Sequence, residues 1–388
     1  MMTPGNIKDK VSIVGMGCTK FGENWDSTAD DMIIDAVYEA YEDAGLGPDD
    51  IQAAWVSVTS SGASGTTLAN PLKLNGIPIT RVENYCASGQ EAIRNAAFAV
   101  ASGMYDIVLA VGFEKLKDSG LRGLPSTNFS DPAIAMGMSA PGSFSLPWAY
   151  FFENHNVTKE TLGKIAVKNH YYGSFNAKAH FQKAVSLEKV INAPIIAWPL
   201  GLFDCCPTTD GASAAILVSQ RIAKKFRDDY INIKATSVSV DSVIPGYRPN
   251  HEFSGWPATR IASQECYRQA GIKDPVKDLD LIELHDCFSI TELVTYCDLG
   301  LCTKEEVKEK IDSDFFSLDG EIPVNISGGL KSFGHPVGAT GVRMVYEIYK
   351  QIQGKVEPQR QVKNASLGLA HNLGGYPQVA SVLIVGTE

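Results

Sequence analysis

The chain has 388 residues, a formal net charge of -10, 44% hydrophobic residues and 20% charged residues. This length suffices for two or three domains, and the composition is ordinary for a globular protein. No basic stripe with interleaved aromatics is present, so we expect no nucleic-acid partner. No apolar run reaches the length of a membrane span, and the first residues lack a signal-peptide core. We therefore expect no membrane association and predict a cytoplasmic protein.

Strand-like and helix-like patterns alternate through the first half of the chain. Short apolar runs typical of buried strands cover residues 10–15, 53–59, 106–112 and 210–218. Helical patterns cover residues 32–44, 68–74, 91–102 and 220–227. Asp26-Ser27-Thr28 precedes the first helix as a cap region, and Gly45 ends it. This alternation is typical of a mostly parallel α/β sheet.

The second half repeats this order. Strands are predicted at 231–240, 279–284 and 378–386, and helices at 257–270, 289–299 and 342–353. The helix at 257–270 ends in Ala270-Gly271, much as the helix at 32–44 ends in Ala44-Gly45. Two similar halves that face each other would bring equivalent strand-to-helix turns together.

Residues 113–199 break the alternation. They are rich in Gly, Pro and Ser and then in aromatics, with one clear helix at about 158–169. A connection of this length predicts a functional lid or small subdomain. Its aromatics suggest a bulky acyl substrate, although most of them are expected to form the lid's own core. We therefore divide the chain into an N-terminal half (1–112 plus 200–228), a lid/loop domain (113–199) and a C-terminal half (229–388).

Cys86 lies between a strand pattern and the start of a helix. Unpaired N–H groups and the helix dipole at such a place are expected to lower the pKa of the thiol. Ser88 and Gly89 keep the neighbourhood small, so a substrate could approach. A buried, inert cysteine is equally compatible with this stretch alone.

Three histidines occupy similar places. His285 is at a strand end before a helix, His335 is in a Gly-rich loop, and His371 is at a strand end before two glycines. A cysteine with a histidine is the usual combination for thiolate nucleophilic catalysis, and further histidines can stabilise an oxyanion or transfer protons. A Cys/His metal site is the rival. We predict no metal, because none of the eight cysteines forms a CxxC pair and no candidate ligands are closely spaced.

Five motifs carry a resemblance to the thiolase superfamily. The runs NYCASG (84–89) and GHPVGATG (334–341) resemble its two signature motifs. HDCF (285–288) resembles the block of the sterol-carrier-type and archaeal-type acetyl-CoA acetyltransferase branch. MGMSA (136–140) is similar to the lid motif, and DGA (210–212) to a common run before the last strand of the first half. The resemblance covers nearly the whole chain.

The resemblance implies an α/β thiolase fold, with two duplicated halves in a five-layer αβαβα arrangement, an inserted lid/loop domain and assembly at least as a dimer. It implies that Cys86 is the nucleophile and that His335 activates it. His285 takes the place of an oxyanion-hole asparagine.

The second oxyanion hole is expected from the backbone N–H groups of Cys86, Leu373 and Gly374. The family's second catalytic cysteine is replaced by His371 at the matching position. We predict that His371 transfers the proton, with Cys287 as the less favoured choice.

The implied reaction is cleavage of a 3-oxoacyl-CoA by coenzyme A, or the reverse Claisen condensation, through an acyl-cysteine and with ping-pong kinetics. Coenzyme A is expected as cosubstrate, and no cofactor is expected to be covalently bound. A small zinc-ribbon/OB-fold companion protein is implied as partner. An aromatic acyl-CoA such as benzoylsuccinyl-CoA is one candidate substrate. The residues that contact CoA are not identified, because no phosphate-cradling motif is present.

Three alternatives remain. A retro-aldolase of the same superfamily lacks the nucleophilic cysteine, so Cys86 argues against it. A condensing synthase of the acyl-carrier type also uses one Cys and two His, but the motif at 334–341 favours thiolase. A non-catalytic lipid carrier or scaffold subunit predicts that Cys86 has no unusual reactivity.

Overall fold

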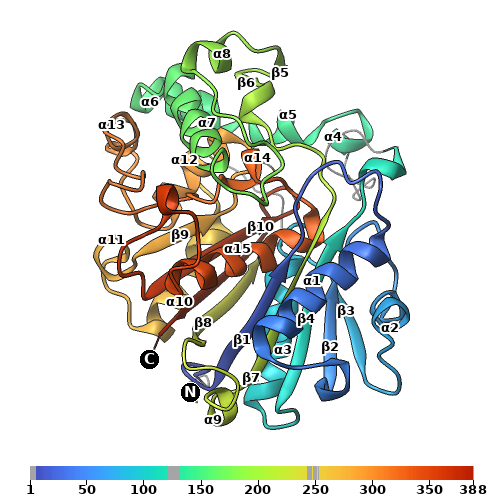
Figure 1. Ribbon diagram of the computed structural model, residues 1–388. Coiled ribbons are helices and arrows are strands. Elements are labelled where there is room, and N and C mark those ends of the chain that lie inside the picture. The colour runs from blue at the N-terminus through green and yellow to red at the C-terminus, as the bar shows by residue number, and fades with distance from the viewer. Residues whose placement is uncertain (1–5, 121–131, 243–246, 248–250, 252, 388) are drawn as a thin grey trace.

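The computed structural model describes residues 6–120, 132–242, 247, 251 and 253–387. Residues 121–131 of the predicted lid lie outside this set. The main feature is a nine-stranded sheet with the order β3-β2-β4-β7-β1-β8-β11-β10-β9 (Figure 1). Its strands are β1 (Val11–Cys18), β2 (Ala53–Ser57), β3 (Ile79–Val82), β4 (Ile107–Glu114), β7 (Gly211–Ser219), β8 (Ile231–Val240), β9 (Leu281–Leu284), β10 (Leu367–Gly374) and β11 (Val379–Gly386).

Strand directions differ from the sequence-based expectation. Only three neighbouring pairs are parallel: β2 with β3, β2 with β4, and β9 with β10. The other neighbours run antiparallel. The prediction of a mostly parallel sheet was therefore wrong. The last strand of each half, β7 in the first and β11 in the second, runs antiparallel to both of its neighbours. A short turn is enough to connect β10 to β11, because antiparallel strands can be joined by a hairpin.

Helices outside the lid segment accompany the sheet in the described part of the chain. They are α1 (Ala29–Ala44), α2 (Thr66–Leu72), α3 (Ser88–Ala101), α9 (Gln220–Ala223), α10 (Pro257–Ala270), α11 (Pro275–Asp278), α12 (Ser289–Asp298), α13 (Val307–Asp312), α14 (Gly329–Ser332) and α15 (Val337–Ile352). Helix α1 packs on β1 and β7, and α10 packs on β8 and β11. Helix α15 contacts α3, strands β4 and β7 of the first half, and strands β9 and β10 of the second. The result is the helix–sheet–helix–sheet–helix order of the thiolase fold.

The two halves of the sheet meet only where β1 pairs with β8, through Ser12 with Asn232 and Ile13 with Ile231. Glycines let the two helices of the middle layer, α3 and α15, approach each other closely. A Cβ on Gly89 of α3 would lie 2.8 Å from the backbone nitrogen of Gly341 on α15. This close approach brings together the start of α3, which follows Cys86, and the start of α15, which follows His335.

The lid segment forms short helices at one end of the molecule, at the top of Figure 1, whereas the termini lie at the opposite end. Its elements are α4 (Pro132–Ala135), α5 (Ala140–Phe144), α6 (Pro147–His155), α7 (Lys159–Gly173), α8 (Leu187–Ile191) and the strands β5 (Ile195–Ala197) and β6 (Leu200–Gly201). The boundary proposed after residue 112 falls inside β4, whereas those after 199 and 228 fall between elements. The division into domains itself stays a prediction.

Candidate functional site

Cys86 sits in a tight turn between β3 and α3. The preceding residue, Tyr85, has a φ of +53°, a left-handed conformation that is uncommon for a residue with a side chain. The Ser88 hydroxyl donates to the Tyr85 carbonyl at 2.5 Å and accepts from the Asn84 N–H at 2.7 Å. These bonds hold the turn and therefore the direction of the Cys86 thiol. Strained backbone of this kind is concentrated at functional sites.

The end of β10 packs directly on this turn. A Cβ on Gly374 would lie 2.4 Å from the carbonyl oxygen of Asn84, so only glycine fits there. Leu373 and Gly374 belong to β10, where they pair with Ala380 and Val379 of β11. The predicted oxyanion-hole residues thus lie beside the Cys86 turn. Their role as hydrogen-bond donors stays a prediction.

The structure brings together Cys86, His285 and His335, which come from three separate segments. One ligand atom of each lies within 4.8 Å of the others. The two imidazole centroids are 5.1 Å apart and the rings are nearly perpendicular, at 86°. Cys86 is half-buried, whereas both histidines are fully buried. The thiol of a half-buried residue therefore faces two water-excluded imidazoles.

The proton of His335 can be located from its neighbours. Thr340 Oγ1 donates to the Pro336 carbonyl at 3.0 Å, so it accepts from His335 Nδ1, which lies 2.7 Å away. The other ring nitrogen, Nε2, then carries a lone pair. Nε2 is buried and has no hydrogen-bond partner within the described part of the chain. His335 is thus arranged as a base with a free acceptor atom.

His285 carries its proton on the same ring nitrogen. Its Nδ1 lies 2.7 Å from Asn372 Oδ1. Because an amide oxygen only accepts, Nδ1 carries the proton and Nε2 a lone pair. Asn372 lies in β10 and was not predicted from the sequence. The signal for Asn372 in the sequence was its position directly after His371.

The pKa values describe a neutral resting site. Burial raises the pKa of the Cys86 thiol to about 12, and the nearby Glu83 carboxylate acts in the same direction. The expected lowering of the thiol pKa was therefore wrong, because desolvation outweighs the helix start. Burial lowers the pKa of His285 to about 3 and that of His335 well below its usual value. Both imidazoles are thus neutral near pH 7 and can accept the Cys86 proton.

His371 does not join this cluster. It lies within β10, not at a strand end as predicted, and its Nε2 is 3.0 Å from Thr259 Oγ1 on α10. Neighbouring side chains of a strand point to opposite faces of the sheet, and the next residue, Asn372, points toward His285. His371 therefore faces the outer helix layer. Burial lowers its pKa to about 3.

Two further thiols lie beside the cluster. Cys206 donates its backbone N–H to the Cys287 carbonyl at 2.8 Å, and Cys205 pairs with Phe288 in an antiparallel bridge. Cys206 and Cys287 therefore oppose each other. Burial raises the pKa of both thiols well above its usual value, and the charge of Cys86 contributes to each shift. Cys287 was weighed from the sequence. Cys206 was missed, although the Cys-Cys-Pro run before 210–212 was a visible signal.

A buried ion network holds the 285–288 block in place. Lys331 Nζ lies 2.7 Å from Asp286 Oδ2 and 3.2 Å from Glu292 Oε2, and all three side chains are fully buried. Asn169 of lid helix α7 donates to the same two carboxylates at 2.9 and 2.7 Å. Burial acts to lower the pKa of Lys331, but the two carboxylates raise it above its usual value. The network fixes Asp286, and with it the residues on either side, His285 and Cys287.

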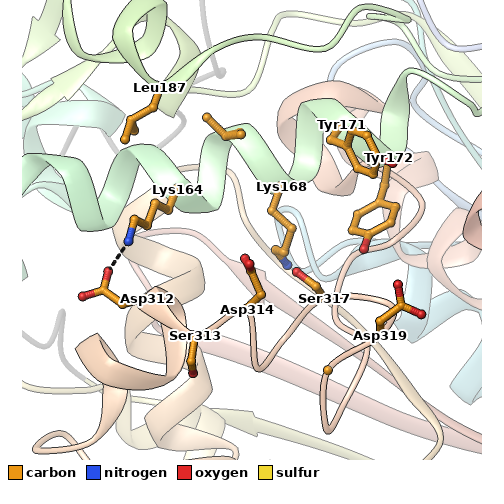
Figure 2. Close-up of a pocket in the computed structure, with 12 residues that line it drawn as sticks. Lys164, Lys168, Tyr171, Tyr172, Leu187, Asp312, Ser313, Asp314, Ser317 and Asp319 are labelled. Carbon is orange, nitrogen blue, oxygen red and sulfur yellow. Dashed lines mark hydrogen bonds and ion pairs between the residues drawn. The ribbon is translucent and has the colours of Figure 1, made fainter.

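A separate hollow of about 620 Å³ lies between α7 and residues 312–320 (Figure 2). Its two lysines are already paired: Lys164 with Asp312 at 2.7 Å and Lys168 with Glu292 at 2.8 Å. Asp314 and Asp319 also line it, so its charge does not favour the phosphates of coenzyme A. None of the clustered catalytic candidates lines this hollow. Among the described residues, the helices lack the combination of length and apolar character needed to cross a bilayer.

Comparisons with known proteins cover almost the whole chain. Residues 11–221 match the thiolase N-terminal domain model, and residues 249–387 match the thiolase C-terminal domain-like model. The acetyl-CoA acetyltransferase of Methanothermobacter thermautotrophicus is 35% identical, over 96% of this chain and 98% of that protein. That of Methanocaldococcus jannaschii is 37% identical, over 94% and 96%. Sterol carrier protein 2 of Gallus gallus is 32% identical, over 95% and 70%.

Solved structures share the fold. The Ltp2-ChsH2(DUF35) aldolase superposes with a TM-score of 0.87 at 24% identity, covering 99% of each chain. Human mitochondrial 3-ketoacyl-CoA thiolase superposes with a TM-score of 0.70 at 17% identity, covering 99% of this chain and 100% of that one.

Proposed function

Because this chain belongs to the thiolase family, in the branch of the archaeal acetyl-CoA acetyltransferases and sterol carrier protein 2, and is an acyltransferase, we propose that it cleaves a 3-oxoacyl-CoA with coenzyme A or runs the reverse Claisen condensation. The observation that supports this most strongly is the meeting of Cys86 with His335, whose Nε2 carries a lone pair. A thiol beside a positioned imidazole base is the arrangement that nucleophilic catalysis requires.

The first half-reaction begins with proton transfer. The Cys86 proton moves to His335 Nε2 as Sγ attacks the 3-oxo carbon, and the new S–C bond leaves a negative charge on the carbonyl oxygen. The backbone N–H groups of Cys86 and Gly374 are the proposed donors to this oxyanion. Breaking the C2–C3 bond then restores the carbonyl as an acyl-Cys86 thioester. The electron pair leaves with C2, as the enolate of the acyl-CoA fragment that keeps C1, C2 and the original coenzyme A.

Protonation of that enolate at C2 requires an acid. We assign this step to Cys287, because its thiol lies beside Cys86, whereas His371 faces Thr259 on the other side of the sheet. The sequence had favoured His371. In the second half-reaction the thiol of coenzyme A gives its proton to the Cys287 thiolate and attacks the acyl-Cys86 carbonyl. The bond between Cys86 Sγ and the acyl carbon then breaks, and Cys86 takes its proton back from His335. Two products released in separate halves give ping-pong kinetics.

The choice between Cys287 and His371 can be tested by hydrogen exchange at C2 of an acyl-CoA in D₂O. General acid–base catalysis contributes on the order of 10²- to 10⁴-fold, so Cys287→Ala should slow exchange at least about 100-fold. His371→Ala should slow it less than about tenfold, since its hydrogen bond to Thr259 is structural. The opposite ranking would return the role to His371. Cys206→Ala serves as the matched thiol control.

The kind of acyl group that the site accepts is proposed from the aromatic residues of the lid. Several lid aromatics are buried, namely Phe144, Trp148, Phe151 and Tyr172. Of these, Phe144 contacts Phe288 of the 285–288 block, with ring centroids 5.1 Å apart and the rings tilted by 47°. We therefore propose that Phe144 borders the acyl group and that bulky acyl-CoAs are accepted. Benzoylsuccinyl-CoA is one candidate, and acetoacetyl-CoA is its small counterpart.

Thiolysis of a panel of 3-oxoacyl-CoA substrates, followed by chromatography of the CoA products, tests the proposal. Parallel double-reciprocal lines with both substrates varied, and loss of turnover in Cys86→Ala, are expected. Cleavage that persists in Cys86→Ala would instead favour the retro-aldolase alternative. No turnover and no acyl adduct on Cys86 would favour a lipid carrier or scaffold.

Assembly and location also belong to this proposal. We expect a homodimer or larger, a cytoplasmic location, and a zinc-ribbon/OB-fold companion protein. The name of the Ltp2-ChsH2(DUF35) aldolase, which shares the fold, likewise joins two components. Light scattering of the purified chain tests the first. Thiolysis assays with and without candidate companions test the last.

A further inference from the structure

The cluster of Cys86, His285 and His335 also has the form of a metal site. Three potential ligand atoms lie within 4.8 Å of one another. Zinc sites with three protein ligands and one open position use Cys and His in this way, with ligand atoms about 3.5 Å apart in a tetrahedron. Small side-chain rotations would close the difference. We propose that this cluster binds one Zn²⁺ reversibly and that the bound ion blocks the nucleophile.

The hydrogen bonds behind the two histidines supply an independent argument. A histidine that binds a metal almost always donates its other ring N–H to an oxygen acceptor. Here His335 Nδ1 donates to Thr340 Oγ1 and His285 Nδ1 donates to Asn372 Oδ1, each at 2.7 Å. Nε2 of each ring is thereby left with a lone pair. His335 Nε2 is buried and has no partner among the described residues.

The thiol completes the set. On binding, Cys86 forms an Sγ–Zn bond and releases its proton to solvent, and no redox change is involved. A soft thiolate with two imidazoles favours Zn²⁺ over Mg²⁺ or Ca²⁺. Sequence spacing had argued against a metal because the ligands are far apart along the chain. The fold brings the three segments together.

Such an ion is an inhibitor and not a resident cofactor, because it occupies the sulfur that must attack the substrate. The inference does not depend on the proposed acyl-transfer reaction. It depends only on the geometry and protonation of the three side chains.

Cobalt substitution tests the site directly. One equivalent of Co²⁺ added to metal-free protein should give tetrahedral d–d bands and a near-ultraviolet thiolate-to-cobalt charge-transfer band. Added Zn²⁺ should displace both. The charge-transfer band should be absent in Cys86→Ala and unchanged in Cys266→Ser, whose thiol donates to the Val382 carbonyl elsewhere. Thr340→Val should weaken Co²⁺ binding about 10- to 100-fold, as loss of such an acceptor typically does.

Alkylation gives a second readout that needs no turnover. Zn²⁺ should slow iodoacetamide labelling of Cys86, read by peptide mass spectrometry, and EDTA should restore it. No thiolate band in the wild-type protein, or a band that persists in Cys86→Ala, would overturn the inference. A Co²⁺ band together with no acyl adduct on Cys86 would contradict the proposed function alone.

Discussion

Replacing Lys331 by methionine removes the central cation of the network that holds the 285–288 block. Its ammonium contacts the carboxylates of Asp286 and Glu292, and all three side chains are fully buried. Glu292 keeps its contact with Lys168 at 2.8 Å, but Asp286 loses the only ammonium that contacts it among the described residues. Removing one partner of a buried pair costs about 3–5 kcal/mol, because a buried charge is left uncompensated.

This cost can be converted into a melting temperature. The unfolding entropy is about 2.1 cal/mol/K per residue, or roughly 0.8 kcal/mol/K for 388 residues. The Tm of Lys331→Met should therefore fall by about 4–6 °C in calorimetry. The exposed Lys277, paired with Asp274 at the surface, is the matched control, and its substitution by methionine should change the Tm by less than about 1 °C.

Neutralising the partner sharpens the test. In an Asp286→Asn background, Lys331→Met should cost less than it does in the wild-type chain, because no full charge is left at position 286. Lys331→Met alone should also change the alkylation rate of Cys86, since the network positions His285. A Tm within about 1 °C of wild type would refute this account of the network.

Three further predictions follow from the same geometry. The alkylation rate of Cys86 should rise about tenfold per pH unit from about pH 7 to pH 9, because a thiol with a pKa near 12 is almost wholly protonated throughout this range. A rate that reaches a plateau near pH 8 would show that the pKa is lowered instead. Thr340→Val should lower kcat/KM about 2- to 10-fold, because the hydrogen bond from His335 Nδ1 to the Thr340 hydroxyl is lost. Thr340→Ser keeps a hydroxyl and should retain activity. Equal losses in the two variants would contradict the assigned position of the His335 proton. Gly374→Ala should reduce kcat on the order of 100-fold, because the added methyl would push on the Asn84 carbonyl. Gly47→Ala is the control, since its Cβ would meet only Asp50 Oδ2, at an ordinary contact distance of 3.9 Å, and an unchanged kcat in Gly374→Ala would show that the Cys86 turn adapts without cost.

Local signals in the sequence predicted most elements well. Strand β8 and helix α10 begin and end where their patterns predicted, and α1 is capped by Thr28 and ended by Gly45 in a left-handed conformation. These features depend on residues close along the chain. The helix predicted at 220–227 is shorter, since α9 ends at Ala223. The meeting of Cys86 with His285 also followed from the internal repeat.

The remaining features depend on tertiary contacts that no local pattern encodes. The strand directions require knowledge of which strands become neighbours. The side of the sheet that His371 faces depends on register, since a shift of one residue exchanges it with Asn372. The raised pKa of Cys86 results from burial by distant segments. The roles of Cys206 and Lys331 likewise appear only when their partners, 81 and 45 residues away, are brought beside them.

The most direct test of the central claim is intact-protein mass spectrometry after incubation with a panel of acyl-CoA and 3-oxoacyl-CoA thioesters. The account predicts one acyl adduct per chain, located on Cys86, discharged by added coenzyme A, and absent from Cys86→Ala. Its mass would identify the acyl group that the site accepts. No adduct from any thioester, with candidate companion proteins also present, would contradict acyl transfer through Cys86.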